Sequence, residues 1–170
     1  MRHPIPRSRG TGQALVEFSL VLPIFLAILM GAVDLGRVVW ASDSLAAAAR
    51  EAARYGIVHG GSASNPCPVG PPSPDAVIPA PSATCPYPAP SKQSIRDRAI
   101  AYAIAGGEQV TVTVCYGAGC TGDADAPNAT NARGTPVTVV VSSRVSLTIP
   151  ALLGIQSFQI SGSSTMVVNH

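Results

Sequence analysis

The sequence predicts an α+β protein: a long N-terminal transmembrane helix extends into a small extracytoplasmic domain that has one further helix and a three-stranded antiparallel sheet. Three observations lead to this fold class. Residues 18–33 carry no charge, and an Ala-rich segment prolongs the helical pattern to about residue 58. Three stretches with alternating valine, isoleucine or threonine follow near the C-terminus, as is typical of strands.

The composition restricts the chain to one small domain and one membrane segment. It has 170 residues, of which 46% are hydrophobic and 12% are charged. Soluble domains usually have about 25% charged residues. The net charge of +2 is small and the basic residues are scattered. We therefore expect no nucleic-acid partner.

Residues 1–12 form a basic leader. They include three arginines, no acidic residue, and several helix-breaking prolines and glycines. Positive charge before a membrane span favours the cytoplasmic side. The leader is therefore predicted to be a cytoplasmic tether, and the chain beyond the span to lie outside.

Residues 13–60 are predicted to be the transmembrane and extended helix. The sixteen uncharged residues 18–33 rise about 24 Å, slightly less than a hydrocarbon core of about 30 Å. Glu17, Arg37 and Trp40 are expected at the two interfaces, and Pro23 should kink or locally open the helix. A cleaved secretory signal is the alternative, but Glu17 and the length of the apolar pattern argue against it.

The outer part of this helix combines a charged pair with a face of small residues. Asp34 and Arg37 are expected to form an i,i+3 pair at the outer interface, with an assembly contact as the alternative. The small face would allow close helix packing; it consists of Leu45, Ala48, Ala49, Ala52, Ala53 and Gly56. Gly60 and Gly61 should end the helix.

The four cysteines all follow the predicted span, and therefore lie in an oxidising compartment if the N-terminus is cytoplasmic. Residues 61–93 are rich in proline and should form a surface loop closed by a Cys67–Cys85 bond, worth about 3 kcal/mol. Cys115 and Cys120 flank a short flexible turn and are predicted to form the second bond. Free thiols and a zinc site are the alternatives, although paired C-x-x-C spacing is missing.

Residues 94–170 are predicted to form the α+β domain. Ser94 to Asp97 fits a capping box that opens a helix closed by Gly106-Gly107. One face of this helix should carry Ile95, Ala99, Tyr102 and Ala103. The strand patterns are Val110–Val114, Val137–Ile149 and Phe158–Val168, each with one buried and one wet face.

The sequence contains no recognisable catalytic arrangement. His3, His59 and His170 are not near any nucleophile motif. Asp123 and Asp125 lack the glycine and distal glutamate of a calcium loop, so plain solvation is expected there, with calcium as the alternative. We expect no enzyme, no cofactor, no metal and no small-molecule substrate.

Three segments carry a family resemblance. They are Gly10-Thr-Gly-Gln-Ala-Leu-Val-Glu-Phe-Ser-Leu-Val-Leu-Pro23, Asp34-Leu-Gly-Arg37 and Ala49-Arg-Glu-Ala-Ala-Arg-Tyr55. In order and spacing they resemble the TadE-like proteins, the minor pilins or pseudopilins of bacterial tight-adherence (type IVc) pili. The resemblance covers about the first third of the chain.

The resemblance implies that a prepilin peptidase cuts after Gly12 and makes Gln13 the new N-terminus. It also implies that Glu17, followed by Phe18, helps subunits join by facing the N-terminal amine of a neighbour. A carboxylate deep in a membrane costs roughly 2.5–3.5 kcal/mol, so a partner is expected. The alternative is an interfacial carboxylate stabilised by its own helix N-terminus.

The function implied by the resemblance is that of a minor pilin in the assembly of a pilus for surface attachment. Its partners would be other pilins, pilus-assembly membrane proteins, the prepilin peptidase and the lipid bilayer. It would reside in the bacterial inner membrane and, after assembly, in an extracellular pilus. The alternative is a single-pass membrane-anchored binding module that never enters a filament.

Overall fold

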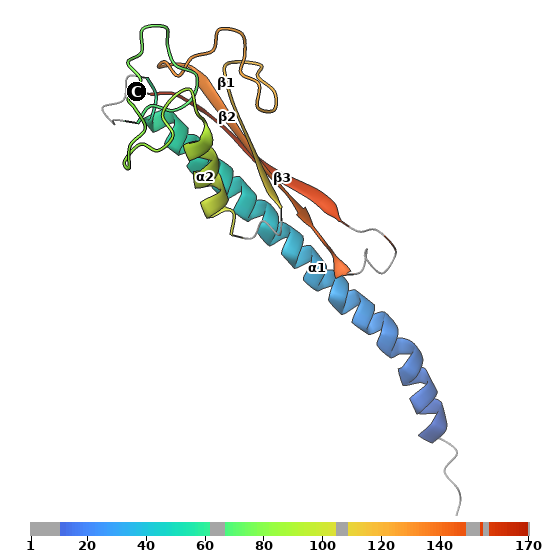
Figure 1. Ribbon diagram of the computed structural model, residues 1–170. Coiled ribbons are helices and arrows are strands. Elements are labelled where there is room, and N and C mark those ends of the chain that lie inside the picture. The colour runs from blue at the N-terminus through green and yellow to red at the C-terminus, as the bar shows by residue number, and fades with distance from the viewer. Residues whose placement is uncertain (1–10, 62–66, 105–108, 149–153, 155–156, 170) are drawn as a thin grey trace, which may run out of the picture.

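The computed structural model describes residues 11–61, 67–104, 109–148, 154 and 157–169. Within these ranges the chain forms two helices and one sheet, in the order α1 (Thr11–Val58), α2 (Gln93–Tyr102), β1 (Val110–Tyr116), β2 (Pro136–Val145) and β3 (Phe158–Val167). The first half of α1 projects alone, whereas its second half lies beneath the sheet (Figure 1). The predicted α+β fold class is confirmed.

The helix α1 has 48 residues and continues without interruption through Pro23. At 1.5 Å per residue it is about 72 Å long. It ends at Val58, as predicted, but it begins at Thr11, inside the stretch assigned to the leader. The arginines of the leader fall on residues 1–10, outside the described part of the chain.

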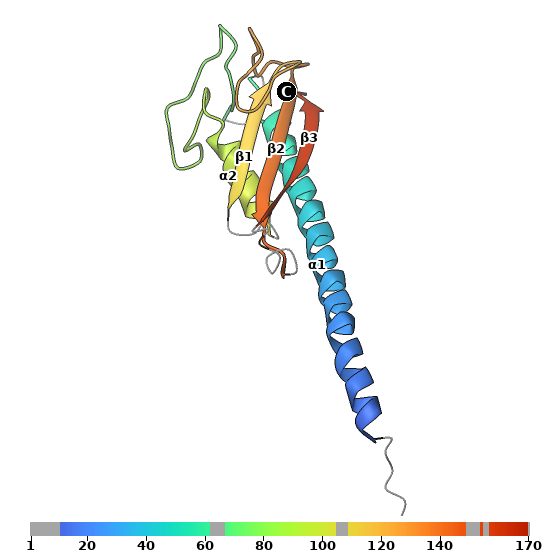
Figure 2. The same ribbon diagram turned by 90° about the vertical axis from the view of Figure 1, so that its right-hand side faces the viewer.

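The small-residue face of α1 is buried inside the protein's own domain. Leu45, Ala48, Ala49, Ala52 and Ala53 are fully buried and belong to one core with residues of α2 and the sheet. Figure 2 shows the sheet lying along this half of α1, with α2 beside it. The close approach that small side chains permit is therefore used to pack β3 and α2 onto the helix.

Gly162 marks a close approach of β3 to α1. A Cβ atom at this position would overlap the backbone of Leu45 and Ala46. Glycine is needed here because the two backbones leave no space for a side chain. This contact fixes how far along α1 the sheet sits.

The sheet is an antiparallel meander in the order β1-β2-β3. Its valines on one face are buried: Val112, Val114, Val137, Val139 and Val141. The opposite face is polar, and Thr138 and Thr165 of neighbouring strands share a hydrogen bond of 2.9 Å between their hydroxyls. The predicted alternation of a buried and a wet face is confirmed.

The last two strand patterns end differently from the prediction. β2 stops at Val145, so that Leu147 lies beyond the strand, and Ile149 is outside the described residues. Phe158 begins β3 but is 43% exposed, whereas Val168 is buried just after the strand. The alternating pattern in the sequence continues past the last residues that pair in the sheet. Alternation alone therefore does not predict where strand pairing stops.

The predicted start and end of α2 are wrong. The Lys92 carbonyl accepts hydrogen bonds from the amides of Ile95 and Arg96, both at 3.2 Å, so Lys92 is the N-cap residue and Ser94 lies inside the helix. A serine inside the first turn cannot cap it. The helix ends at Tyr102, and Gly106 and Gly107 fall outside the described residues.

One residue of the predicted buried face of α2 is exposed. Ile95, Ala99 and Ala103 are buried, but Tyr102 is 44% exposed. The guanidinium of Arg98 lies 5.3 Å from the centre of the Tyr102 ring. This cation–π contact holds the ring at the surface.

The four cysteines form the bonds Cys67–Cys85 and Cys115–Cys120, and no cysteine among them is free. This is the pairing that the two local loops predicted, and the free-thiol and zinc alternatives are wrong. Residues 67–92 form neither helix nor strand.

Buried Asn131 ties the proline-rich loop to the end of α1. Its side-chain amide donates to the carbonyl of Val69 at 3.0 Å, and its own carbonyl accepts from the amide of Gly61 at 2.9 Å. A single asparagine thus joins three segments that are distant in sequence. No local pattern indicated this role.

The contact at Gly162 gives the first testable prediction. Gly162→Ala should destabilise the domain by about 1–3 kcal/mol, because the added methyl group forces β3 away from α1. Urea unfolding of the detergent-solubilised protein measures the change. The control is Gly36→Ala, where a Cβ atom meets nothing within 4 Å and no loss is expected. Equal stability of both variants would contradict the close packing.

Candidate assembly and membrane surface

The bare half of α1 is the most unusual surface of the molecule. Residues 12–30 are all exposed, and large apolar side chains point outward on every side of the helix. By length and composition, α1 is able to cross a membrane. So large an apolar surface marks contact with lipid or with other proteins.

The predicted processing and assembly residues lie together in the first turns of α1. A Cβ atom at Gly12 would meet nothing within 4 Å, and Phe18 is 63% exposed. The side-chain amide of Gln13 donates a hydrogen bond of 3.3 Å to the carboxylate of Glu17, one turn away. Glu17 is exposed, so its carboxylate is accessible to a neighbouring group.

The outer end of the bare half is marked by charge and by Trp40. The predicted pair is present, with a guanidinium nitrogen of Arg37 4.0 Å from a carboxylate oxygen of Asp34. The Asp34 side chain is only 7% exposed, whereas that of Arg37 is 59% exposed. Trp40 is 64% exposed, as expected for a ring in a headgroup layer.

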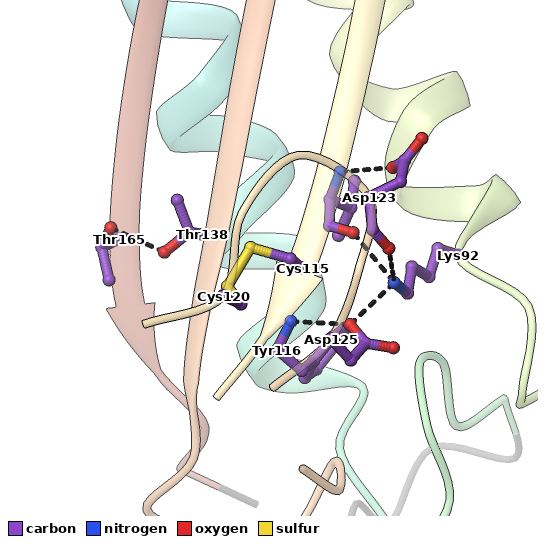
Figure 3. Close-up of a disulfide and its surroundings, with 9 residues drawn as sticks. Lys92, Cys115, Tyr116, Cys120, Asp123, Asp125, Thr138 and Thr165 are labelled. Atoms are coloured by element: carbon purple, nitrogen blue, oxygen red, sulfur yellow. Dashed lines mark hydrogen bonds and ion pairs between the residues drawn. A yellow bond between two sulfur atoms is a disulfide. The ribbon is translucent and has the colours of Figure 1, made fainter. Parts of the chain in front are cut away.

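A polar site formed by two aspartates covers the open edge of β1 (Figure 3). The amide of Val114 donates to Asp123 Oδ1 at 2.9 Å, and the amide of Tyr116 donates to Asp125 Oδ1 at 2.8 Å. Both aspartates come from the loop that the Cys115–Cys120 bond holds against the strand. The carboxylates thus satisfy amides that an edge strand would otherwise leave open to another chain.

Two basic side chains of the α2 region complete this site. Lys92 Nζ donates to the carbonyls of Val114 and Asp123, both at 2.9 Å, and to Asp125 Oδ1 at 2.7 Å. Arg96 donates to Asp123 Oδ1 at 3.0 Å. Plain solvation of the two aspartates was therefore the wrong expectation. Their carboxylates already hold amides and cations, and the described residues contain no group of three metal-ligating side chains.

A signal for this arrangement was present in the sequence. Asp123 and Asp125 are two residues apart, the same spacing as the amides of Val114 and Tyr116 on one edge of a strand. The closing disulfide brings the loop back to that edge. The match of spacings becomes recognisable only when the path of the loop is known.

Two groups at this site titrate away from their usual ranges. Partial burial alone would raise the pKa of Asp123, but the Val114 amide and the guanidinium of Arg96 outweigh it, so its pKa lies below the usual value. Burial, and then the charge of Asp125, raise the pKa of Tyr116 far above its usual value. Tyr116 is therefore neutral at physiological pH.

The first part of the chain is similar to a known protein family. The model of the TadE-like protein family matches residues 12–54. The match begins at Gly12 and ends in the buried half of α1, which confirms the resemblance drawn from the sequence. The proline-rich loop, α2 and the sheet lie outside the matched segment. No curated protein and no solved structure matches the chain.

The charge of Asp123 gives a pH-dependent prediction. Since its pKa is lowered on folding from 3.8, its stabilisation is present above pH 3.8 and is lost as the pH falls through the folded-state pKa. Asp123→Asn should lower the free energy of unfolding at pH 7 by about 0.5–1.5 kcal/mol, and this difference should shrink at low pH. Urea unfolding at a series of pH values tests this, with Asp75→Asn in the proline-rich loop as control. A difference that does not change with pH would contradict the role of the charge.

Proposed function

We propose that this TadE-like chain is a minor pilin, or pseudopilin, that takes part in the assembly of a tight-adherence-type pilus for surface attachment. One observation carries the proposal: the family match covers a helix that is bare and apolar in its first half and built into a domain in its second. Such a helix serves as a membrane anchor before assembly and as a filament contact afterwards.

Because α1 has a bare half and a half built into the domain, the bare half can move from lipid into a filament without disturbing the fold. Residues 12–30 contribute nothing to the buried core, which begins near Ala41. Moving these residues from lipid to the apolar surface of neighbouring helices exchanges one apolar environment for another. The domain therefore keeps its fold during the transfer. Its orientation, with the N-terminus cytoplasmic and the domain outside, follows from the basic leader.

Glu17 gives the assembly step its specificity in this proposal. Its carboxylate is expensive in an apolar environment, so it seeks a positive partner. A prepilin peptidase that cut after Gly12 would create such a partner, the amine of Gln13 on a neighbouring subunit. Before assembly, the Gln13 side chain already holds the carboxylate at 3.3 Å. Other pilins, pilus-assembly membrane proteins and the peptidase are thus the proposed partners.

The role proposed here is structural rather than enzymatic. What the bare helix offers is a surface for lipid and for other helices. A single-pass anchored binding module would need the same span, but it would not need processing at Gly12. Processing therefore distinguishes the two functions.

Processing at Gly12 is the first prediction of this function. Co-expression with a matching prepilin peptidase should shorten the chain by its first twelve residues, and N-terminal sequencing of the membrane-extracted protein should begin at Gln13. Gly12→Val should prevent the cut, because the peptidase pocket must accept the side chain. The matched control is Gly36→Val, which lies on the same helix far from the cut. An intact Met1 in cells that assemble the pilus would support the permanent anchor instead.

The second prediction separates assembly from folding. Glu17→Gln removes the charge but keeps the size and helix propensity of the side chain. The variant should insert in the membrane and form both disulfides, because Glu17 is far from the core. It should be depleted from sheared pili, since the neighbouring amine loses its counter-charge where ion pairs are strong.

Glu17→Asp is the control for this experiment, because it keeps the charge and should retain incorporation better than Glu17→Gln. Immunoblots of sheared pili and of membranes measure both variants. Normal incorporation of Glu17→Gln, with Gly12 processed, would show that the carboxylate is only interfacial.

A further inference from the structure

The end of β2 reaches beside the part of α1 that would cross the membrane. Leu147, just beyond this strand, lines an apolar groove with residues from about three turns of α1: Ile28, Gly31, Ala32, Asp34, Leu35 and Val38. Of these helix residues, Ile28, Gly31 and Ala32 belong to the uncharged run of residues 18–33. A residue of the outer domain therefore lies at the height of the membrane span.

The rise per residue of the strands and of α1 independently places Leu147 level with the same part of the helix. Gly162 abuts Leu45 and Ala46, and the strands run alongside α1 toward its N-terminus (Figures 1 and 2). Phe158 lies four residues farther down β3, about 13 Å at 3.3 Å per residue, which equals about nine helical residues. This puts Phe158 level with about Arg37. Leu147 follows the partner of Phe158 by two residues and comes level with about Ala32.

The bilayer cannot be shifted downward to avoid this overlap. The uncharged run already rises only about 24 Å, less than the hydrocarbon core of about 30 Å. Lowering the outer surface below Leu147 would remove another turn from that run. The lower end of the domain must therefore meet the outer leaflet.

The side chains at this end change from polar to apolar in the direction of the membrane. Arg144 pairs with Gln159 near the height of Trp40, and both line a small polar hollow on the outer face of the sheet. Below them, Phe158 is 43% exposed and Leu147 is half-buried. A cation at headgroup level above apolar side chains is the usual order of an interfacial contact.

We propose that Arg144, Leu147 and Phe158 form a second membrane contact, in which the two apolar side chains enter the outer leaflet and Arg144 meets lipid phosphates. We name this set the lower rim. Lipid is the favoured occupant because the groove is continuous with the bare half of α1 and lies at the depth of the uncharged run. The inference rests on the membrane span of α1 and does not depend on pilus assembly.

The test measures the depth of an indole in the bilayer. Trp40 is the single tryptophan of the chain, so Trp40→Phe gives a background without indole. In this background, Leu147→Trp places one in the lower rim, and Phe158→Trp is a more conservative second reporter. Val77→Trp is the matched control, since Val77 is 92% exposed in the proline-rich loop. The full chain is reconstituted in phosphatidylcholine–phosphatidylglycerol vesicles with or without bromine on the acyl chains.

Bromine should quench both lower-rim indoles at least as strongly as it quenches Trp40 in the parent chain, at low and at high protein density. The Val77→Trp control should not be quenched. Peptide mapping of both disulfides verifies that each variant is folded.

Three results would overturn the proposal in distinguishable ways. Quenching of Trp40 without quenching of either lower-rim indole would exclude the second contact alone. An unquenched Trp40 in the parent chain would exclude the span of α1 and the second contact with it. If the lower-rim indoles are not quenched and this surface cross-links to a second copy of the chain, the lower rim is a contact between subunits and not with lipid.

Discussion

The packing of the small-residue face of α1 beneath the sheet is the contact on which the other features depend. It takes place where Gly162 meets the backbone of Leu45 and Ala46. Because alanines let the sheet approach so closely, the second half of α1 can act as the central element of the core. Since the helix is continuous, the same contact also fixes the position of the domain relative to the bare, apolar half of α1.

A sheet built on one side of a helix leaves its edge strands open. At β1 the protein covers the edge with the loop that carries Asp123 and Asp125, and Lys92 and Arg96 neutralise both carboxylates. The Cys115–Cys120 bond keeps the loop short and close. Such protection matters because an open edge pairs readily with another strand.

The features that could be predicted from sequence are those that local chemistry determines. The end of α1 at Val58 follows from the glycines at positions 60 and 61, and its buried face follows from the helical spacing of small residues. The two disulfides follow from loops that are local in sequence. By contrast, the side-chain contact of Lys92 with Asp125, the edge site at Asp123 and the three-way link at Asn131 each depend on segments far apart in the chain. Periodicity contains no information about such partners.

The candidate assembly site likewise has one part that could be predicted from local sequence and one part that could not. The roles expected of Gly12, Gln13, Glu17 and Phe18 came from the resemblance to the TadE-like proteins, which is carried by a continuous stretch of sequence. The position of Leu147 beside the span was not, because the strand pattern alone placed it within β2, on the buried face of the sheet. Its location requires the register of β2 with β3 and the contact of Gly162 with α1.

Glu17 and the lower rim, which lie at opposite ends of the bare half of α1, would both affect release from the membrane in the proposed function. If the lower rim sits in lipid, leaving the membrane exposes Leu147 and Phe158 as well as α1. Because less than half of each side chain is exposed in the protein, moving this surface into water costs about 1–2 kcal/mol for the two together, a fraction of the roughly 1.5–3 kcal/mol for each fully buried side chain. In the proposed function, Glu17 acts in the opposite direction, since its carboxylate would gain an amine partner only when a neighbouring subunit is present. In the proposed function, a neighbouring subunit that covers the bare half of α1 and the lower rim and also pairs with Glu17 would favour release from the membrane, which couples extraction to docking.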